Sequence, residues 1–116
     1  YFIPYLRDMK KEVFKAVLLD GKNKIIKDVT ISEGTLSKTI VHPREIIKEA
    51  VIESSAALVL IHNHPSGEPQ PSPDDIEITN RIVSACELVG IKVLDHIIIG
   101  DNNYFSFFNE GLIKEE

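Results

Sequence analysis

The sequence is poor in the features that mark secreted and membrane proteins. It has one cysteine, Cys86, so an intrachain disulfide is impossible and a zinc site made of cysteine pairs is excluded. The longest unbroken apolar run, residues 56–61, is far too short to span a membrane. No segment near residue 1 joins a basic start to a long apolar stretch, as a signal peptide does. These absences predict a cytoplasmic protein without membrane contact.

The sequence also lacks the basic balance of a typical nucleic-acid binder. Its net charge is −5. Residues 1–27 hold seven Lys or Arg against three Asp or Glu, whereas the rest of the chain holds six against fifteen. A solvated lysine-rich face is the favoured interpretation of the basic start, and a contact surface is the alternative. We therefore expect at most weak DNA binding from this domain.

Length and composition indicate one ordinary globular domain. The chain has 116 residues, enough for a single core without disulfides or metals as staples. Apolar residues make up 43% and charged residues 27%, typical of a globular protein and unlike a disordered one. The first residue is not methionine, so we expect the chain to belong to a longer protein.

Apolar patterning predicts strands mixed with two helices. The first strands, a hairpin closed by a turn at residues 20–23, come before the first helix, which begins at Pro43. The second helix has Ser72 as its N-cap and Pro73 at its first position, and Gly90 ends it. Its predicted inward stripe is Ile78, Ile82, Ala85 and Val89. The predicted strands are residues 13–19, 24–32, 56–61, 92–99 and 104–108, with 35–41 as a further candidate, and the first helix is 43–55.

Two histidines follow the buried strand 56–61. His62 and His64 are two positions apart, and on a strand such residues face the same side, roughly 6.6–6.8 Å apart along the chain. Two imidazoles can converge on one ion from there. Ends of buried strands are also where open α/β sheets place their sites.

A carboxylate from the second helix can complete this set. Asp75 lies in its first turn, and two nitrogens with one carboxylate oxygen are a typical catalytic zinc set, with water in the fourth position. Such a set makes hydroxide available near neutral pH. The spacing leaves two alternatives open. First, Asp74 flanks the inward stripe as Asp75 does. Second, Ser72 and Asp75 could simply form a helix cap and have no role in metal binding.

These residues resemble a known family. His62, His64, Ser72 and Asp75 follow the order and spacing of the JAMM motif of MPN/JAB1 metallopeptidase-like domains, namely His-x-His, seven residues, Ser, two residues, Asp. The string His-Asn-His-Pro-Ser-Gly at residues 62–67 resembles the bacterial RadC branch. So do His-Pro-Arg-Glu at 42–45 and Leu-Asp-His-Ile at 94–97.

The resemblance implies an α/β fold of three α/β/α layers with a mixed, cytidine-deaminase-like sheet over a single domain, residues 1–116. It implies one zinc ion per chain, bound by His62, His64 and Asp75. Ser72 would hydrogen-bond the bound water or the developing oxyanion. Glu12, just before the first strand, would be the general base.

Other interpretations accompany these roles. Glu12 can instead be a surface acid among lysines, and Glu33 is the reserve candidate for the base. His42 is interpreted as a helix-start residue, His96 as a core histidine with satisfied partners, and Cys86 as core filler.

Three functions compete at this point. The resemblance implies a JAMM-type zinc hydrolase that cleaves a peptide or isopeptide bond in a peptide or protein substrate. The alternative is a non-catalytic zinc-containing binding module, since RadC-type proteins are traditionally labelled DNA repair proteins. Their usual upstream helix-hairpin-helix segment is absent here, so we expect this chain to be the C-terminal part of a longer one. A zinc deaminase is disfavoured, because the His-x-Glu and Pro-Cys-x-x-Cys motifs are both missing.

Overall fold

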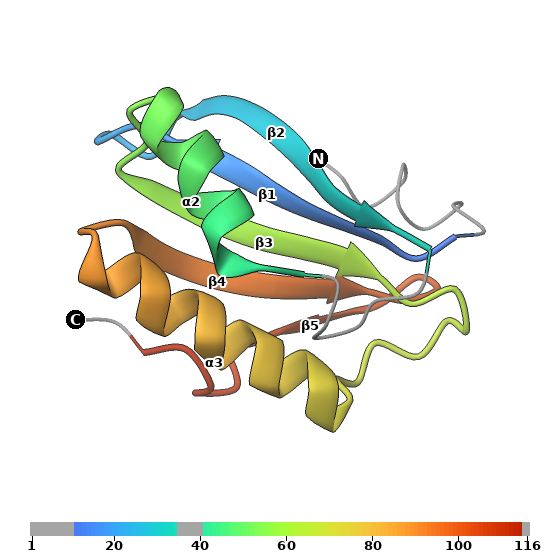
Figure 1. Cartoon of the computed structure of the whole chain (residues 1–116). Coiled ribbons are helices and arrows are strands. Elements are labelled where there is room, and N and C mark those ends of the chain that lie inside the picture. The colour runs from blue at the N-terminus through green and yellow to red at the C-terminus, as the bar shows by residue number, and fades with distance from the viewer. Residues whose placement is uncertain (1–10, 35–40, 115–116) are drawn as a thin grey trace.

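The computed structural model describes residues 11–34 and 41–114. These residues form one five-stranded sheet in the order β2-β1-β3-β4-β5 (Figure 1). Strands β3 and β4 are parallel, and the other neighbouring pairs are antiparallel, so the predicted α/β class and mixed sheet are confirmed. The elements are β1 Val13–Leu19, β2 Ile25–Glu33, α2 Pro43–Ile52, β3 Ala57–Asn63, α3 Pro73–Leu88, β4 Lys92–Ile99 and β5 Tyr104–Ser106.

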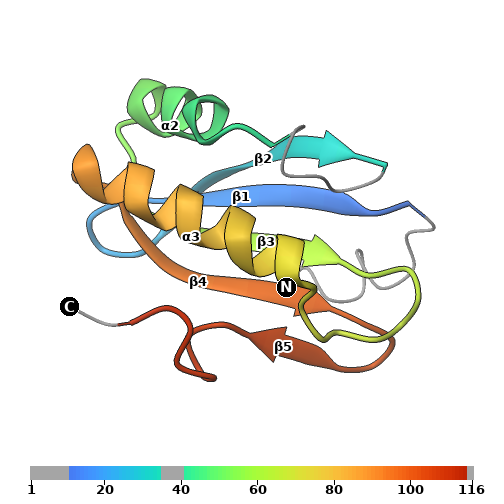
Figure 2. The same ribbon diagram turned by 60° about the horizontal axis from the view of Figure 1, so that its bottom comes forward.

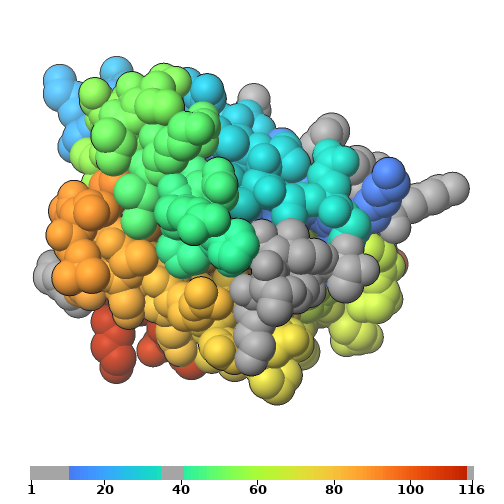
Figure 3. Space-filling model, viewed as in Figure 1, coloured from blue at the N-terminus to red at the C-terminus, as the bar shows by residue number. Residues whose placement is uncertain are grey.

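Both described helices lie on the same face of the sheet, as Figures 1 and 2 show. Their side chains meet over the central strands, which are hidden in the space-filling view from that side (Figure 3). The second helical layer of the expected three-layer arrangement is not among the described residues. The main core between helices and sheet includes Phe14, Leu18, Ile46, Leu58, Leu60, Ile78, Ile82 and Ile98.

The opposite face of the sheet carries a smaller apolar cluster: Val13, Val17, Leu19, Ala57, Ile61 and Ile99. Strands β1 and β3 are therefore buried on both faces, which explains their nearly continuous apolar sequences. None of the helices in the described ranges is long and apolar enough to cross a membrane.

The start of α3 was predicted correctly, but its inward stripe was predicted wrongly near the end. Ser72 is the N-cap and Pro73 opens the helix. The stripe continues from Ile82 to Cys86, whereas Val89 is 53% exposed because it lies beyond the last helical residue. Helix α2 ends at Ile52, earlier than predicted, where the chain turns through a positive φ at Ser54. The candidate strand at 35–41 falls almost entirely outside the described residues.

Candidate metal centre

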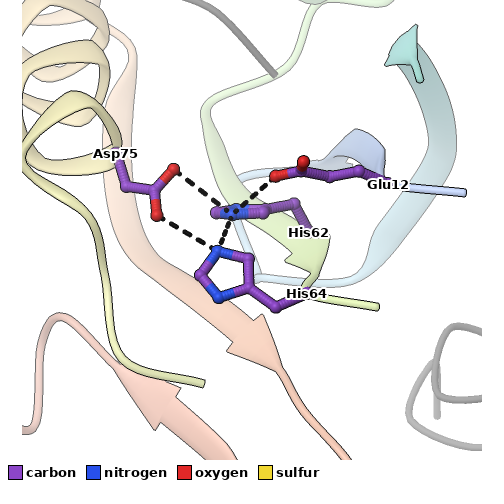
Figure 4. Close-up of side chains that lie close together, drawn as sticks. All are labelled: Glu12, His62, His64 and Asp75. Carbon is purple, nitrogen blue, oxygen red and sulfur yellow. Dashed lines mark hydrogen bonds and ion pairs between the residues drawn. The ribbon is translucent and has the colours of Figure 1, made fainter. Parts of the chain in front are cut away.

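The two histidines of the His-x-His motif converge at the carboxyl end of β3. His62 lies on the helix-covered face and is fully buried, in register with Phe14 of β1. His64 follows just after the strand, and its backbone N–H donates to the carbonyl of Ile99. The two Nε2 atoms are 3.0 Å apart (Figure 4). The predicted convergence of the two imidazoles is confirmed.

The structure distinguishes the two candidate aspartates. Asp75 is buried, and its two carboxylate oxygens lie 3.5 Å from His62 Nε2 and 3.1 Å from His64 Nε2. Asp74 is exposed and does not belong to this group of side chains. Among the two, Asp75 is therefore the one that the fold of α3 brings to the histidines.

Ser72 holds Asp75 in place through a capping box. Its backbone N–H donates to Asp75 Oδ2 at 2.8 Å, and its Oγ accepts from the Asp75 backbone N–H at 3.1 Å. The helix cap and the candidate ligand are thus the same structure, because the oxygen that caps the helix also faces His64. The cap interpretation and the site interpretation of these two residues are compatible.

Glu12 comes to the same place from the start of β1. It lies two residues before Phe14, so its side chain leaves the chain on the face that carries His62. Its Oε1 is 3.8 Å from His62 Nε2, and its side chain is 23% exposed. Figure 4 shows the carboxylate directed at the imidazoles rather than away from them. Glu33, the reserve candidate, is exposed and lies outside the group.

The hydrogen bonds leave His64 Nε2 available to a metal. His64 Nδ1 lies 2.8 Å from the carbonyl oxygen of Glu68, which can only accept, so Nδ1 carries the proton. The hydrogen bond with Asp75 raises the pKa of His64, with burial opposing it. Without a metal, the hydrogen bond between His64 Nε2 and Asp75 Oδ2 needs a proton, which a bound ion would displace.

The other two candidate ligands, His62 and Asp75, both have lowered pKa values, which favour their deprotonated forms. Burial lowers the pKa of His62 to about 3, although the nearby Asp75 carboxylate acts in the opposite direction. For Asp75, burial raises the pKa, but the hydrogen bond from His64 and the charges of both histidines outweigh it and hold the pKa at about 2. A metal ion would meet a neutral imidazole and a carboxylate at these two positions.

The separations among the donors fit one bound ion. Glu12, His62, His64 and Asp75 each offer one ligand atom, and these atoms all lie within 4.8 Å of one another. Zinc bound tetrahedrally at its usual distances places its ligand atoms about 3.3 Å apart. The separations among His62, His64 and Asp75 are 3.0, 3.1 and 3.5 Å. The two Asp75 separations run to different oxygens of its carboxylate. All three separations are close to the tetrahedral value, so this group can bind a metal ion.

Two residues beside the group were not assigned a functional role from the sequence. His96 is buried as predicted, but its Nε2 lies 2.7 Å from His62 Nδ1, directly behind the site. Asn63 faces the other side of β3, as its position on the strand implies, and its side-chain amide bonds to the backbone of Lys11 and Val13. The motif string at 62–67 contained Asn63, but only the tertiary structure joins it to the segment around Glu12.

The mixed sheet, the helix layer and the His-x-His site define a domain of the JAB/MPN type. The family model described as "RadC-like JAB domain" matches residues 1–112. This chain belongs to the RadC-like JAB domain family, and the resemblance stated from the sequence is confirmed.

Relatives from bacteria and archaea are similar over nearly the whole chain. A UPF0758 protein of Trichlorobacter lovleyi is 58% identical over 97% of this chain and 49% of its own length. A UPF0758 protein of Clostridioides difficile is 55% identical over 97% and 48%. One of Methanosarcina mazei is 50% identical over 96% and 48%. The chain therefore spans about half the length of these relatives.

Proposed function

We propose that this domain is a zinc-dependent hydrolase that cleaves a peptide or isopeptide bond, with one zinc per chain held by His62, His64 and Asp75. The observation that carries the proposal is the place of Glu12. The Glu12 carboxylate lies farther from His62 Nε2 than the donor atoms of His64 and Asp75 do. Its side chain is also the most exposed in the group of four residues. An acid at the open side of a three-donor group is where a general base must stand.

The donor set favours zinc over harder cations. Two imidazole nitrogens and one carboxylate oxygen are typical zinc ligands, whereas Mg²⁺ and Ca²⁺ prefer oxygen ligands throughout. When bound, zinc would act as a Lewis acid that polarises the scissile carbonyl and increases the acidity of the attacking water.

The chain's own residues would move the proton and stabilise the developing charge. Glu12 would accept the proton of the attacking water and deliver it to the leaving amine. Ser72 Oγ already accepts from the Asp75 backbone N–H, so its hydroxyl proton can be directed toward the oxyanion of the substrate. The same serine would therefore position a ligand and stabilise the transition state.

A second candidate function is a non-catalytic zinc module in a DNA-repair context. The observation in its favour is that the Glu12 carboxylate lies in the same group of donor atoms as the three proposed ligands. As a fourth ligand, Glu12 would close the coordination shell, as in structural zinc sites. The two candidates differ in what removal of the Glu12 carboxylate does to metal binding.

The experiment compares Glu12→Gln with Glu33→Gln, the same change at an exposed acid on the neighbouring strand. Zinc-loaded protein is offered internally quenched peptides and isopeptide-linked peptide pairs, and zinc content is measured on the same samples. We expect Glu12→Gln to keep its zinc and to lose about 10²–10⁴-fold in turnover. Loss of zinc in Glu12→Gln, with no turnover by the unaltered protein, would favour the binding module.

We also propose a location and partners for the protein. The free cysteine is buried in the core, as suits a reducing compartment, and we place the protein in the cytoplasm. We propose a peptide or protein as the partner of the site. Because the chain spans about half of its relatives, we propose that this domain contacts DNA only weakly or through segments outside it.

A further inference from the structure

A buried chain of hydrogen bonds leads from His62 back to the helix that carries Asp75. His62 Nδ1 lies 2.7 Å from His96 Nε2, and His96 Nδ1 lies 2.5 Å from Thr79 Oγ1. Thr79 Oγ1 lies 2.7 Å from the backbone carbonyl oxygen of Asp75. The side chains of His62, His96 and Thr79 are fully buried. These hydrogen bonds thus connect β3, β4 and α3 behind the site.

Only one arrangement of protons gives each of these contacts a hydrogen. The Asp75 carbonyl can only accept, so the single hydroxyl proton of Thr79 must lie between Thr79 and Asp75. The contact between Thr79 and His96 then needs its proton from His96 Nδ1. A neutral His96 with its proton on Nδ1 has a bare Nε2, so the contact with His62 needs its proton from His62 Nδ1.

The consequence for the site is a defined tautomer of His62. With its proton on Nδ1, His62 presents an unprotonated Nε2 to His64, Asp75 and Glu12. The opposite tautomer would place a proton where a metal must bind. His64 keeps its Nδ1 proton by a shorter route, because its Nδ1 donates to the Glu68 carbonyl.

The apolar surroundings of this buried hydrogen-bond chain offer its members no replacement hydrogen-bond partners. Phe14 stacks beside His62 at a centroid distance of 5.7 Å, and Phe107 stacks on His96 at 4.6 Å. In the described part of the chain, no buried side-chain nitrogen or oxygen lacks a hydrogen-bond partner. Burial, together with the neighbouring His62, lowers the pKa of His96. Loss of one member would therefore leave an unpaired polar group inside an apolar enclosure.

We propose that His96 and Thr79 are positioning residues that fix His62 in its Nδ1-protonated tautomer and direct its Nε2 lone pair at the metal. The proposal rests on the proposed function only in taking zinc as the ion that His62 binds. The tautomer itself is a property of the metal-free protein. Partners of this kind, behind a metal-binding histidine, commonly contribute 10- to 100-fold to metal affinity.

The first test reads the tautomers directly. Protein with ¹⁵N-labelled histidine is freed of metal by a chelator, and long-range ¹H–¹⁵N correlation spectra are recorded at pH 8. The four histidines of the chain keep the spectrum simple. We expect His62 and His96 both to carry their proton on Nδ1. A proton on Nε2 of His62 would overturn the proposal, whatever the domain's activity.

The second test measures the affinity for Zn²⁺ alone by competition with a chromogenic chelator. Thr79→Val removes the hydroxyl, and His96→Leu removes both ring nitrogens. Each should weaken zinc binding about 10- to 100-fold. Thr79→Ser keeps a hydroxyl, and His96→Gln keeps an acceptor and a donor, so both should return affinity to near the unaltered value.

Cys86→Ala is the matched control, since Cys86 is also fully buried on the inward face of α3 but lies two turns beyond Thr79. It should lower thermal stability without changing zinc affinity or the His62 tautomer. Equal loss of affinity in Cys86→Ala and Thr79→Val would contradict the proposal, because the effect would then be general loosening of the core. If the unaltered protein bound no zinc, the proposed function would fail while the tautomer result still stood.

Discussion

Asn63 holds the backbone on both sides of Glu12. Its Oδ1 accepts from the backbone N–H of Val13 at 2.6 Å, and its Nδ2 donates to the carbonyl of Lys11 at 2.9 Å. Asn63 lies between His62 and His64 in the sequence, so one short segment supplies two candidate ligands on one face and the clamp for the candidate base on the other.

Asn63→Ala should therefore separate positioning of Glu12 from metal binding. The backbone groups of Lys11 and Val13 lose buried partners, at a cost of about 1–3 kcal/mol in the free energy of unfolding. Zinc content should stay the same, whereas turnover should fall by up to about 10²-fold, because a small displacement of a catalytic group is costly. Asn80→Ala, at an exposed position of α3, should change neither. Unchanged turnover in folded Asn63→Ala would show that the clamp is not needed.

The neighbouring aspartates give a second matched pair. Asp75→Asn should abolish tight zinc binding, because the buried carboxylate faces both histidines. Asp74→Asn should cost only a fraction of a kcal/mol in the free energy of unfolding, through the weakened interaction with the helix dipole. Titration with zinc and thermal unfolding measure both effects. The reverse order would identify Asp74 as the ligand.

Sequence patterns correctly predicted the features that depend on a single helix or strand. The bounds of β1 and β4 were predicted from apolar runs, and the start of α3 from its cap. The choice between Asp74 and Asp75 could not be made in this way, because both flank the inward face. It depends on the rotation of α3 about its axis, which packing against the sheet fixes.

His96 shows a different limit. The register of β4 against β3 shifts between Leu58 and Val59, so that Leu58 pairs with Val93 and Val59 with Asp95. One extra residue in β4 moves every following side chain to the other face. Without that shift His96 would lie opposite Ile61, on the face away from His62. Alternation along one strand cannot predict a bulge that exists only relative to its neighbour.

Metal affinity should depend on pH through a single proton. The pKa of His64 is raised, so below that pKa zinc must displace one proton from His64, and affinity should fall tenfold per pH unit. His62 and Asp75, with pKa values of about 3 and about 2, should not compete above pH 4. Zinc titrations between pH 5 and 8 measure the slope. A slope of two protons would mean that His62 is also protonated in the metal-free protein.

Binding to duplex DNA by this domain should be weak and without sequence preference. The net charge of −5 opposes contact with phosphates, and any affinity from the basic residues near the start should fall steeply with salt. Fluorescence anisotropy with a labelled duplex at several salt concentrations checks this. Sub-micromolar, salt-resistant binding would contradict the prediction and favour the DNA-repair module.

The most direct measurement is the metal content of protein purified without chelator, by elemental analysis, beside His64→Ala. A site made by His62, His64 and Asp75 predicts close to one zinc per chain in the unaltered protein and loss of that zinc in His64→Ala. Full zinc retention in folded His64→Ala, or no bound zinc in unaltered protein supplied with the metal, would contradict the account.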